Sequence, residues 1–344
     1  MSIGFISLGF ICRKDKRMFY LLLAFMIIII TYTYNNADWN AYEFMYGQIN
    51  SIDRCSLTDI GYGVLNYVSN SIFHLKFFHF RALFTFIGML IISHTILNYS
   101  PYPALVLALY FIAPFFPNDI IQIRNFMAQA ILVFFISNWI DNNKVKYLFI
   151  AIGLSTMMHS SCIYFVIFIL LLFINDEKKL YISVGVGSLF VGILPTLLNK
   201  LPFVSSEKIL FYLGKTNNNI DIRGIIIIAV FFVQLYMLHY IRNKLCNLGN
   251  MDYYRWADYI YKMNILCIPA CIIMTVWSFN FYRVPRNMLL LNYIVYSMYI
   301  KENHSKRIIE FMTLILILHG ICWSTLNSFS QWNVIWNNNA IIKW

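Results

Sequence analysis

The sequence predicts an all-α polytopic membrane protein with about 11 or 12 transmembrane helices. Of its 344 residues, 60% are hydrophobic and only 12% are charged, whereas a soluble globular domain carries about 25% charged residues. The apolar residues form blocks long enough to cross a bilayer, which takes roughly 20 residues. Runs such as GIIIIAVFFVQLYMLHY are apolar on every side. The strands of a membrane β-barrel would instead alternate between apolar and polar residues.

Eleven apolar blocks are candidates for these helices. They fall at 18–34, 80–98, 103–118, 120–140, 147–158, 161–174, 181–199, 223–240, 263–282, 287–300 and 308–325. The segment 2–12 is short for a span, so it is either a truncated first helix or an interfacial one.

Basic residues predict the orientation of these spans. Five clusters hold 15 of the 26 Lys and Arg residues: 13–17, 142–146, 176–179, 242–262 and 301–307. Cytoplasmic loops are enriched in basic residues, so we expect all five clusters inside. The external side then receives 35–79, the Arg124 end of its helix, His159, residues 200–222 and the C-terminal tail.

Residues 61–79 must then stay outside the bilayer, because a span there would place 142–146 outside. One helical face of this segment carries Val64, Leu65, Val68, Ile72 and Leu75. This pattern predicts an amphipathic helix on the external membrane surface.

The same parity condition predicts a break in residues 147–174. Both flanks are cytoplasmic, and TMMHSSC (156–162) in the middle is a suitable place for a turn near the outer side. We expect a single integral membrane domain over 1–344, with an external segment at 35–79, a cytoplasmic loop at 241–262 and an external tail at 326–344.

Several function classes lose support from the sequence. The net charge of +11 is dispersed between apolar blocks, which fits cytoplasmic loops and gives no reason to expect nucleic acid as a partner. The seven cysteines have no metal-ligand spacing, and we expect no cofactor. There is no Walker A loop, HExxH, GxSxG or pair of carboxylates with metal spacing.

Arg124 stands out because it lies near the start of an apolar run. A charge inside a membrane helix costs roughly 2.5–3.5 kcal/mol on insertion scales. The arginine either reaches the membrane surface, with Asp119 as a local partner, or faces a polar cavity. Gln122, Asn125 and Gln129 favour the cavity, because they add polar atoms to the same stretch.

Arg283 and Arg286, in FYRVPRN, form a second basic feature on the outer side, where basic residues are rare. They anchor lipid head groups or bind phosphate, which the planar guanidinium holds with paired hydrogen bonds. Together with Arg124 they would make a cationic site suited to a pyrophosphate.

Other candidates lie on the same predicted side. His159 is either a structural residue or a general base. Asp38, Tyr42 and Tyr46 share a helical face through their i, i+4, i+8 spacing. Acidic and aromatic side chains together suit carbohydrate, and tyrosine is also ordinary at membrane interfaces. The same alternatives apply to Asp59 and Tyr62.

Four stretches together resemble the EpsG-like branch of the Wzy-type bacterial polysaccharide polymerases, over roughly residues 18–325. They are DWNAYEFMY, TDIGYGVLNYV, IRNFMAQAILVFFISNWIDNNKVKYLFIAIGLSTMMHSS and NFYRVPRNMLLLNYIVY. The sequence departs from the family pattern at the N-terminus, which lacks a full first span, and at Asp59, where Glu is commoner. An arginine that often precedes the first stretch is replaced by TYTYNN.

The resemblance implies a metal-independent glycosyltransferase with a C-type membrane fold. Its substrate would be an oligosaccharide on undecaprenyl pyrophosphate, and its product a capsule, exopolysaccharide or O-antigen chain. It would act at the outer face of the bacterial cytoplasmic membrane, often with a separate protein that regulates chain length. In this reading, Arg124, Arg283 and Arg286 bind the pyrophosphate. Arg124 also contributes to catalysis, His159 or Asp38 assists deprotonation of the acceptor, and Tyr42, Tyr46, Asp59 and Tyr62 contact sugar.

Two other functions remain open at this point. A lipid-linked oligosaccharide flippase would also bind pyrophosphate through arginine, but such transporters are expected to show inverted repeats, and the sequence shows no internal symmetry. A glycan ligase uses the same lipid-linked donor with a different acceptor, and no sequence motif separates it from a polymerase.

Overall fold

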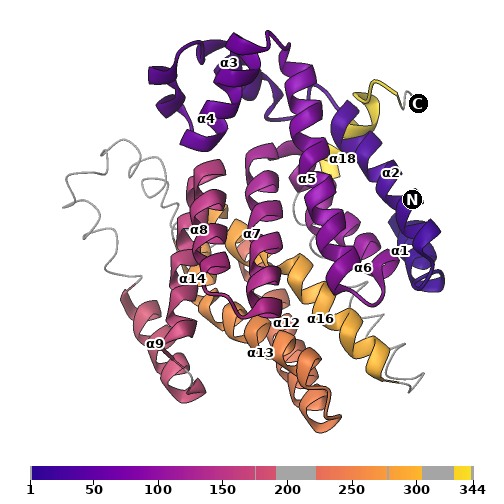
Figure 1. Ribbon diagram of the computed structural model, residues 1–344, viewed down its shortest axis with the longest axis vertical. Coiled ribbons are helices and arrows are strands. Elements are labelled where there is room, and N and C mark those ends of the chain that lie inside the picture. Colours follow the sequence, from indigo (N-terminus) through magenta and orange to yellow (C-terminus); the bar gives the residue numbers. More distant parts are fainter. Residues whose placement is uncertain (1, 175, 191–221, 277–278, 304–328, 342–344) are drawn as a thin grey trace. The chain divides into compact units, whose positions relative to one another are not determined.

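The computed structural model describes residues 2–174, 176–190, 222–276, 279–303 and 329–341 (Figure 1). Within these ranges the chain is helical, and the one β-type pairing there is an isolated antiparallel bridge between Thr33 and Asn339. The predicted all-α fold is therefore confirmed. The predicted block 308–325 and most of the second half of 181–199 lie outside the described residues.

Four of the described helices are long and apolar enough to cross a membrane: Phe77–Tyr99, Ile123–Asn142, Gly224–Asn247 and Met251–Thr275. Shorter apolar helices follow at Lys146–Met158 and Ser160–Leu172. The protein is thus a membrane protein with several spans, as predicted. The count of 11 or 12 stays a prediction.

The chain divides into two compact units, which are described separately. The first unit contains Met1–Ile163 and Leu289–Trp344, and the second contains Tyr164–Met288. The expectation of one integral membrane domain over 1–344 stays a prediction.

The first unit is built on long helices joined by short ones. Its elements are α1 (Ser2–Ile11), α2 (Lys16–Tyr32), α3 (Trp39–Gln48), η1 (Ile52–Leu57), α4 (Ile60–Tyr67), η2 (Val68–Ile72), α5 (Phe77–Tyr99), α6 (Pro103–Tyr110), η3 (Phe111–Asp119), α7 (Ile123–Asn142), α8 (Lys146–Met158), the start of η4 (Ser160–Leu172), α16 (Leu289–Glu302) and α18 (Phe329–Asn337).

Helix α1 is too short to cross the bilayer. Ten residues of α-helix extend about 15 Å, half of the roughly 30 Å hydrocarbon core. Gly9 lets α1 approach α6 closely, because a Cβ atom at this position would lie 2.4 Å from Cβ of Ala108.

The predicted external segment contains α3, η1, α4 and η2. The amphipathic helix is shorter than the sequence suggests: η2 ends at Ile72, His74 adopts a left-handed conformation with φ of 50°, and α5 begins at Phe77. Ile60, Val64 and Ile72 are exposed, as expected for side chains that face lipid.

The C-terminal tail packs beside the end of α2, where the external segment begins. The backbone N–H of Tyr34 donates to the carbonyl of Asn338 at 2.8 Å, and that of Ala340 donates to Tyr32 at 2.9 Å. The two segments therefore lie at the same end of the first unit, in keeping with a common side of the membrane.

The second unit contains the rest of η4, α9 (Glu177–Phe190), α12 (Ile222–Asn247), α13 (Met251–Leu266), α14 (Ile268–Val276), η5 (Phe279–Tyr282) and α15 (Arg283–Asn287). The segment 241–262, expected as a loop, is mostly helical, because α12 continues to Asn247 and α13 begins at Met251. Its position on the cytoplasmic side stays a prediction.

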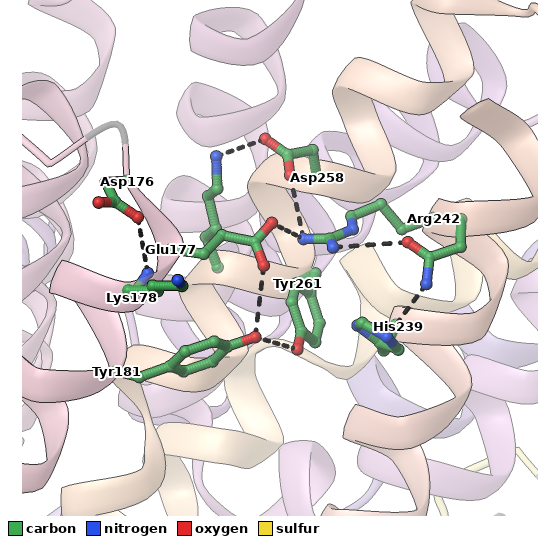
Figure 2. A network of polar contacts seen from close by, with 10 residues as sticks. Asp176, Glu177, Lys178, Tyr181, His239, Arg242, Asp258 and Tyr261 are labelled. Carbon is green, nitrogen blue, oxygen red and sulfur yellow. Dashed lines mark hydrogen bonds and ion pairs between the residues drawn. The ribbon is translucent and has the colours of Figure 1, made fainter.

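A network of charged and polar side chains joins three helices of this unit (Figure 2). Arg242 of α12 donates to Glu177 of α9 and lies 3.4 Å from Asp258 of α13. Its guanidinium also lies over the ring of Tyr261, 4.6 Å from the ring centroid. The Arg242 side chain is only 8% exposed, and burying its charge is costly. The contacts with these partners offset that cost.

Candidate active site

His159 lies at a break between two helices, as the sequence predicts. Helix α8 ends at Met158, and His159 is extended, with φ of −152° and ψ of 116°. Its backbone N–H still donates to Ser155 at 2.9 Å, and the chain then continues into η4. The break places the imidazole at the end of α8.

Asp59 brings this histidine and Arg124 together. Its Oδ2 lies 2.9 Å from Nη1 of Arg124 and 3.3 Å from Nδ1 of His159. Arg124 is the second residue of α7, and Asp59 directly precedes α4. Three segments that the sequence predicts on one side of the membrane therefore meet at a single carboxylate.

Close contact between α4 and α8 makes this meeting possible. A Cβ atom at Gly61 would lie 2.9 Å from both Cβ and the carbonyl oxygen of Met157. Only glycine allows this approach, because any side chain would push the two backbones apart. The glycine two residues after Asp59 thus lets the carboxylate reach His159.

The other oxygen of Asp59 is also bonded. Oδ1 accepts the backbone N–H of Ser160 at 3.0 Å. Burial, the largest single effect, raises the pKa of the Asp59 carboxyl, but the hydrogen bond with His159 and the charge of Arg124 outweigh it. The pKa of Asp59 therefore lies below its ordinary value, and the group is an anion at neutral pH.

Arg124 keeps donor capacity beyond its contact with Asp59. Nη1 also donates to Oγ1 of Thr58 at 2.7 Å, while Nε has no hydrogen-bond acceptor among the described residues. The guanidinium lies 5.4 Å from the ring centroid of Tyr42 and 5.7 Å from that of Tyr62. The side chain is still 29% exposed, so a solute can reach it.

The predicted tyrosine face of α3 divides into two environments. Tyr42 is partly exposed and faces Arg124. Tyr46 is buried, its hydroxyl donates to the carbonyl of Leu75 at 2.8 Å, and burial raises its pKa to about 12. Asp38 lies one turn before Tyr42 and accepts its N–H through the backbone carbonyl. The roles of these residues stay predictions.

Tyr62 is fully buried beneath the site. Its ring packs against Tyr42, Phe80 and Phe84, and burial raises its pKa strongly. Tyr62 therefore supports Arg124 through the contact of its ring with the guanidinium. A contact of Tyr62 with sugar would require this cluster of aromatic rings to open.

Arg283 and Arg286 belong to the second unit. Arg286 is fully buried; its Nη1 donates to the hydroxyl of Tyr282 at 2.7 Å, and the guanidinium lies over that ring. Arg283 is partly exposed. The prediction that these arginines act on the same pyrophosphate as Arg124 remains untested.

Three residues that contact the site or its supports were not predicted from the sequence. Thr58 directly precedes Asp59, and Ser160 directly follows His159. Their residue types give no sequence signal for a role in the site. Arg81, by contrast, lies in an apolar run, as Arg124 does, so the same signal could have identified it. The local partner considered for Arg124, Asp119, instead accepts a hydrogen bond from the hydroxyl of Tyr110 at 2.7 Å.

No group of three or more His, Cys, Asp or Glu side chains suited to a metal ion occurs in the part of the chain that the structure describes. The arrangement instead offers a carboxylate-bound imidazole beside a partly exposed guanidinium. These are the groups needed to accept a proton and to stabilise an anion.

Comparison with protein families identifies a match over nearly the whole chain. The model of the EpsG family matches residues 16–339, which covers nearly all of both units. A search of the curated proteins and of the solved structures gives no match.

Proposed function

Because the chain belongs to the EpsG family, we propose that it is a polysaccharide polymerase of the bacterial cytoplasmic membrane. The family is associated with a polymerase-like role in exopolysaccharide biosynthesis. In the proposed reaction, the growing glycan moves from undecaprenyl pyrophosphate to the next lipid-linked oligosaccharide at the outer face. The cluster of Arg124, Asp59 and His159 is the observation that carries this proposal.

The proposed transfer exchanges one bond at the anomeric carbon. The bond from this carbon to the pyrophosphate oxygen breaks, and a bond to a hydroxyl oxygen of the acceptor sugar forms. The acceptor loses a proton, and undecaprenyl pyrophosphate leaves with additional negative charge. The protein must therefore accept a proton at one position and stabilise an anion at another.

Arg124 is suited to the anion. Its side chain is still 29% exposed while Nη1 donates to Asp59 and Thr58, so the guanidinium can also contact a substrate anion. It also lies in the first turn of α7, where backbone N–H groups without intrahelical partners favour negative charge. A cation here is unfavourable for the helix itself, and a bound phosphate would offset that cost. Arg283 and Arg286 are further candidates for binding the pyrophosphate.

His159 is suited to accept the proton from the acceptor hydroxyl. A neutral imidazole that donates from Nδ1 to Asp59 presents Nε2 as the acceptor. Asp59 would hold this tautomer and stabilise the imidazolium after proton transfer, which makes it a positioning residue. This contact favours His159 over Asp38 as the base. Tyr42, partly exposed beside Arg124, is the best placed of the tyrosines to contact sugar.

Purified protein in lipid nanodiscs tests the reaction directly. Given only lipid-linked repeat units, a polymerase produces a ladder of longer lipid-linked glycans and releases undecaprenyl pyrophosphate. A flippase produces neither. A ligase leaves single units unextended and transfers glycan only when a different acceptor is added. Unextended units under every condition would contradict the proposal.

A further inference from the structure

A buried arginine behind the candidate active site has no carboxylate partner among the described residues. Arg81 of α5 is 1% exposed. Its guanidinium donates to three backbone carbonyls of the described residues: Nη1 to Ile30 at 2.8 Å and to Thr33 at 2.7 Å, and Nη2 to Ile120 at 3.0 Å. A buried charge is costly, so an arginine held in this way calls for an explanation.

All three carbonyls lie at helix ends. Ile30 is in the last turn of α2 and Thr33 follows that helix, while Ile120 lies in the break between η3 and α7. The last carbonyls of a helix have no intrahelical donor, and they carry the negative end of the helix dipole. Arg81 therefore donates hydrogen bonds to carbonyls that lipid cannot satisfy. Its positive charge also attracts the partial negative charge of these helix ends.

The acceptor at Ile120 ties Arg81 to Arg124. Ile120 precedes Arg124 by four residues, and its carbonyl also accepts Nδ2 of Asn36 at 3.3 Å. Two donors from outside the helix thus fix the backbone just before α7 begins. The direction in which α7 starts sets the position of the Arg124 side chain.

The other side of Arg81 reaches α3. Its guanidinium lies 5.5 Å from the ring centroid of Trp39, the first residue of that helix. Tyr42, which faces Arg124, follows three residues later. Arg81 thus contacts the chain at the start of both α7 and α3, the helices that carry Arg124 and Tyr42.

We propose that Arg81 is a positioning residue, which clamps the start of α7 to α2 and α3 and thereby fixes Arg124 and Tyr42 for catalysis. This inference rests on the proposed function for its catalytic consequence. The clamp requires the planar fork of arginine, because a lysine ammonium is a single point that cannot meet three separated carbonyls in the same way.

Hydrogen exchange of the full-length protein tests the clamp without reference to activity. Arg81→Lys should raise exchange of the amides in 118–126 and 36–42 by at least about tenfold, with no change in the second unit. Arg242→Lys is the matched control, because Arg242 is also a buried arginine over an aromatic ring but lies in the second unit (Figure 2). It should change exchange in α9, α12 and α13 only. Unchanged exchange at 118–126 in Arg81→Lys would overturn the proposal.

A double-variant comparison tests the catalytic consequence. Arg81→Lys should lower kcat by at least about tenfold. The loss in the Arg81→Lys, Arg124→Lys double variant should be smaller than the product of the two single losses, because part of the effect of Arg81 acts through the Arg124 guanidinium. Losses that multiply would overturn the positioning role. If wild type and Arg124→Ala were equally active, the proposed role of the site would fail while the exchange result would still decide the clamp.

A milder variant covers the case in which Arg81→Lys does not accumulate. Asn36→Ala removes the second donor to Ile120 and leaves Arg81 in place. It should raise exchange at 118–126 about threefold, as expected for the loss of roughly 0.5–1 kcal/mol of hydrogen bonding. A rise of about tenfold or more would contradict the clamp, because Asn36 and not Arg81 would then be the main donor that holds this backbone.

Discussion

Oδ2 of Asp59 lies 2.9 Å from Nη1 of Arg124, although 65 residues separate them in the sequence. The same oxygen contacts His159, another 35 residues beyond Arg124 in the chain. Because the pKa of Asp59 lies below its ordinary value, the carboxylate is charged whenever the protein is at neutral pH. One fixed anion thus orients both groups that the proposed reaction uses.

Replacing Asp59 by Asn tests that relationship. The amide keeps the size of the side chain but removes the charge, so His159 loses the partner that stabilises its imidazolium. We expect polymerase activity to fall by about 10²–10⁴-fold, the range of general-base contributions. Activity is measured as glycan ladder formation at matched protein levels. Tyr46→Phe is the comparison: it removes a hydroxyl that donates to the backbone carbonyl of Leu75, away from Asp59, and it should retain activity.

The pH dependence of stability gives a second test of Asp59. A carboxyl group with a lowered folded pKa stabilises the protein above its unfolded pKa of about 3.9, and this contribution disappears as pH falls through the folded pKa. The difference in Tm between wild type and Asp59→Asn should therefore stay constant from pH 8 to about 5 and shrink below about 4. A difference that already disappears between pH 8 and 6 would show that another group controls it.

Gly63 provides a test of packing in the external segment. A Cβ atom there would lie 2.2 Å from the backbone carbonyl of Cys55, which cannot move aside as a flexible side chain can. Gly63→Ala should destabilise the protein by about 1–3 kcal/mol or more, as overpacking does, measured as a lower Tm in detergent. Gly47→Ala is the matched control, because no atom lies within 4 Å of its added Cβ. Equal Tm values for the two variants would contradict the packing of α4 on η1.

Cysteine labelling tests the membrane orientation. Cys246 is exposed near the end of α12, on the predicted cytoplasmic side, and Ser56 is exposed in η1 of the predicted external segment. In a background without the other cysteines, an impermeant maleimide should label Ser56→Cys in intact cells but not Cys246. In inverted vesicles it should label Cys246 only. The reverse pattern would place the candidate site on the cytoplasmic side.

The sequence predicted the helical class and the break at His159 because both follow from local patterns. Long apolar blocks require helices in lipid, and the basic clusters impose the parity that demands a turn near 156–162. The same parity assigned the Arg124 end of α7, His159 and the segment with Asp59 to one side. Their convergence on one carboxylate depends on tertiary packing, such as the contact of Gly61 with α8, which no local pattern contains.

Other features depend on contacts that no local pattern reveals. Tyr46 has the same helical spacing as Tyr42, yet it is buried with its hydroxyl on Leu75, because α3 turns that part of its face toward α5. The helix predicted over 61–79 is interrupted at His74, where the left-handed backbone allows α5 to begin. Arg81 was detectable as a charge in an apolar run, but its carbonyl partners come from distant helix ends.

The role of Arg124 is tested by complementation of a deletion strain with wild type, Arg124→Lys or Arg124→Ala, followed by electrophoresis of the lipid-linked and surface glycan. We expect the deletion to accumulate single repeat units at the outer face and wild type to extend them into a ladder. Arg124→Ala should leave them single at normal membrane levels, with a loss of at least about 100-fold, and Arg124→Lys should fall well below wild type because it lacks the fork. A full ladder from Arg124→Ala would contradict the proposal that this arginine stabilises the departing pyrophosphate.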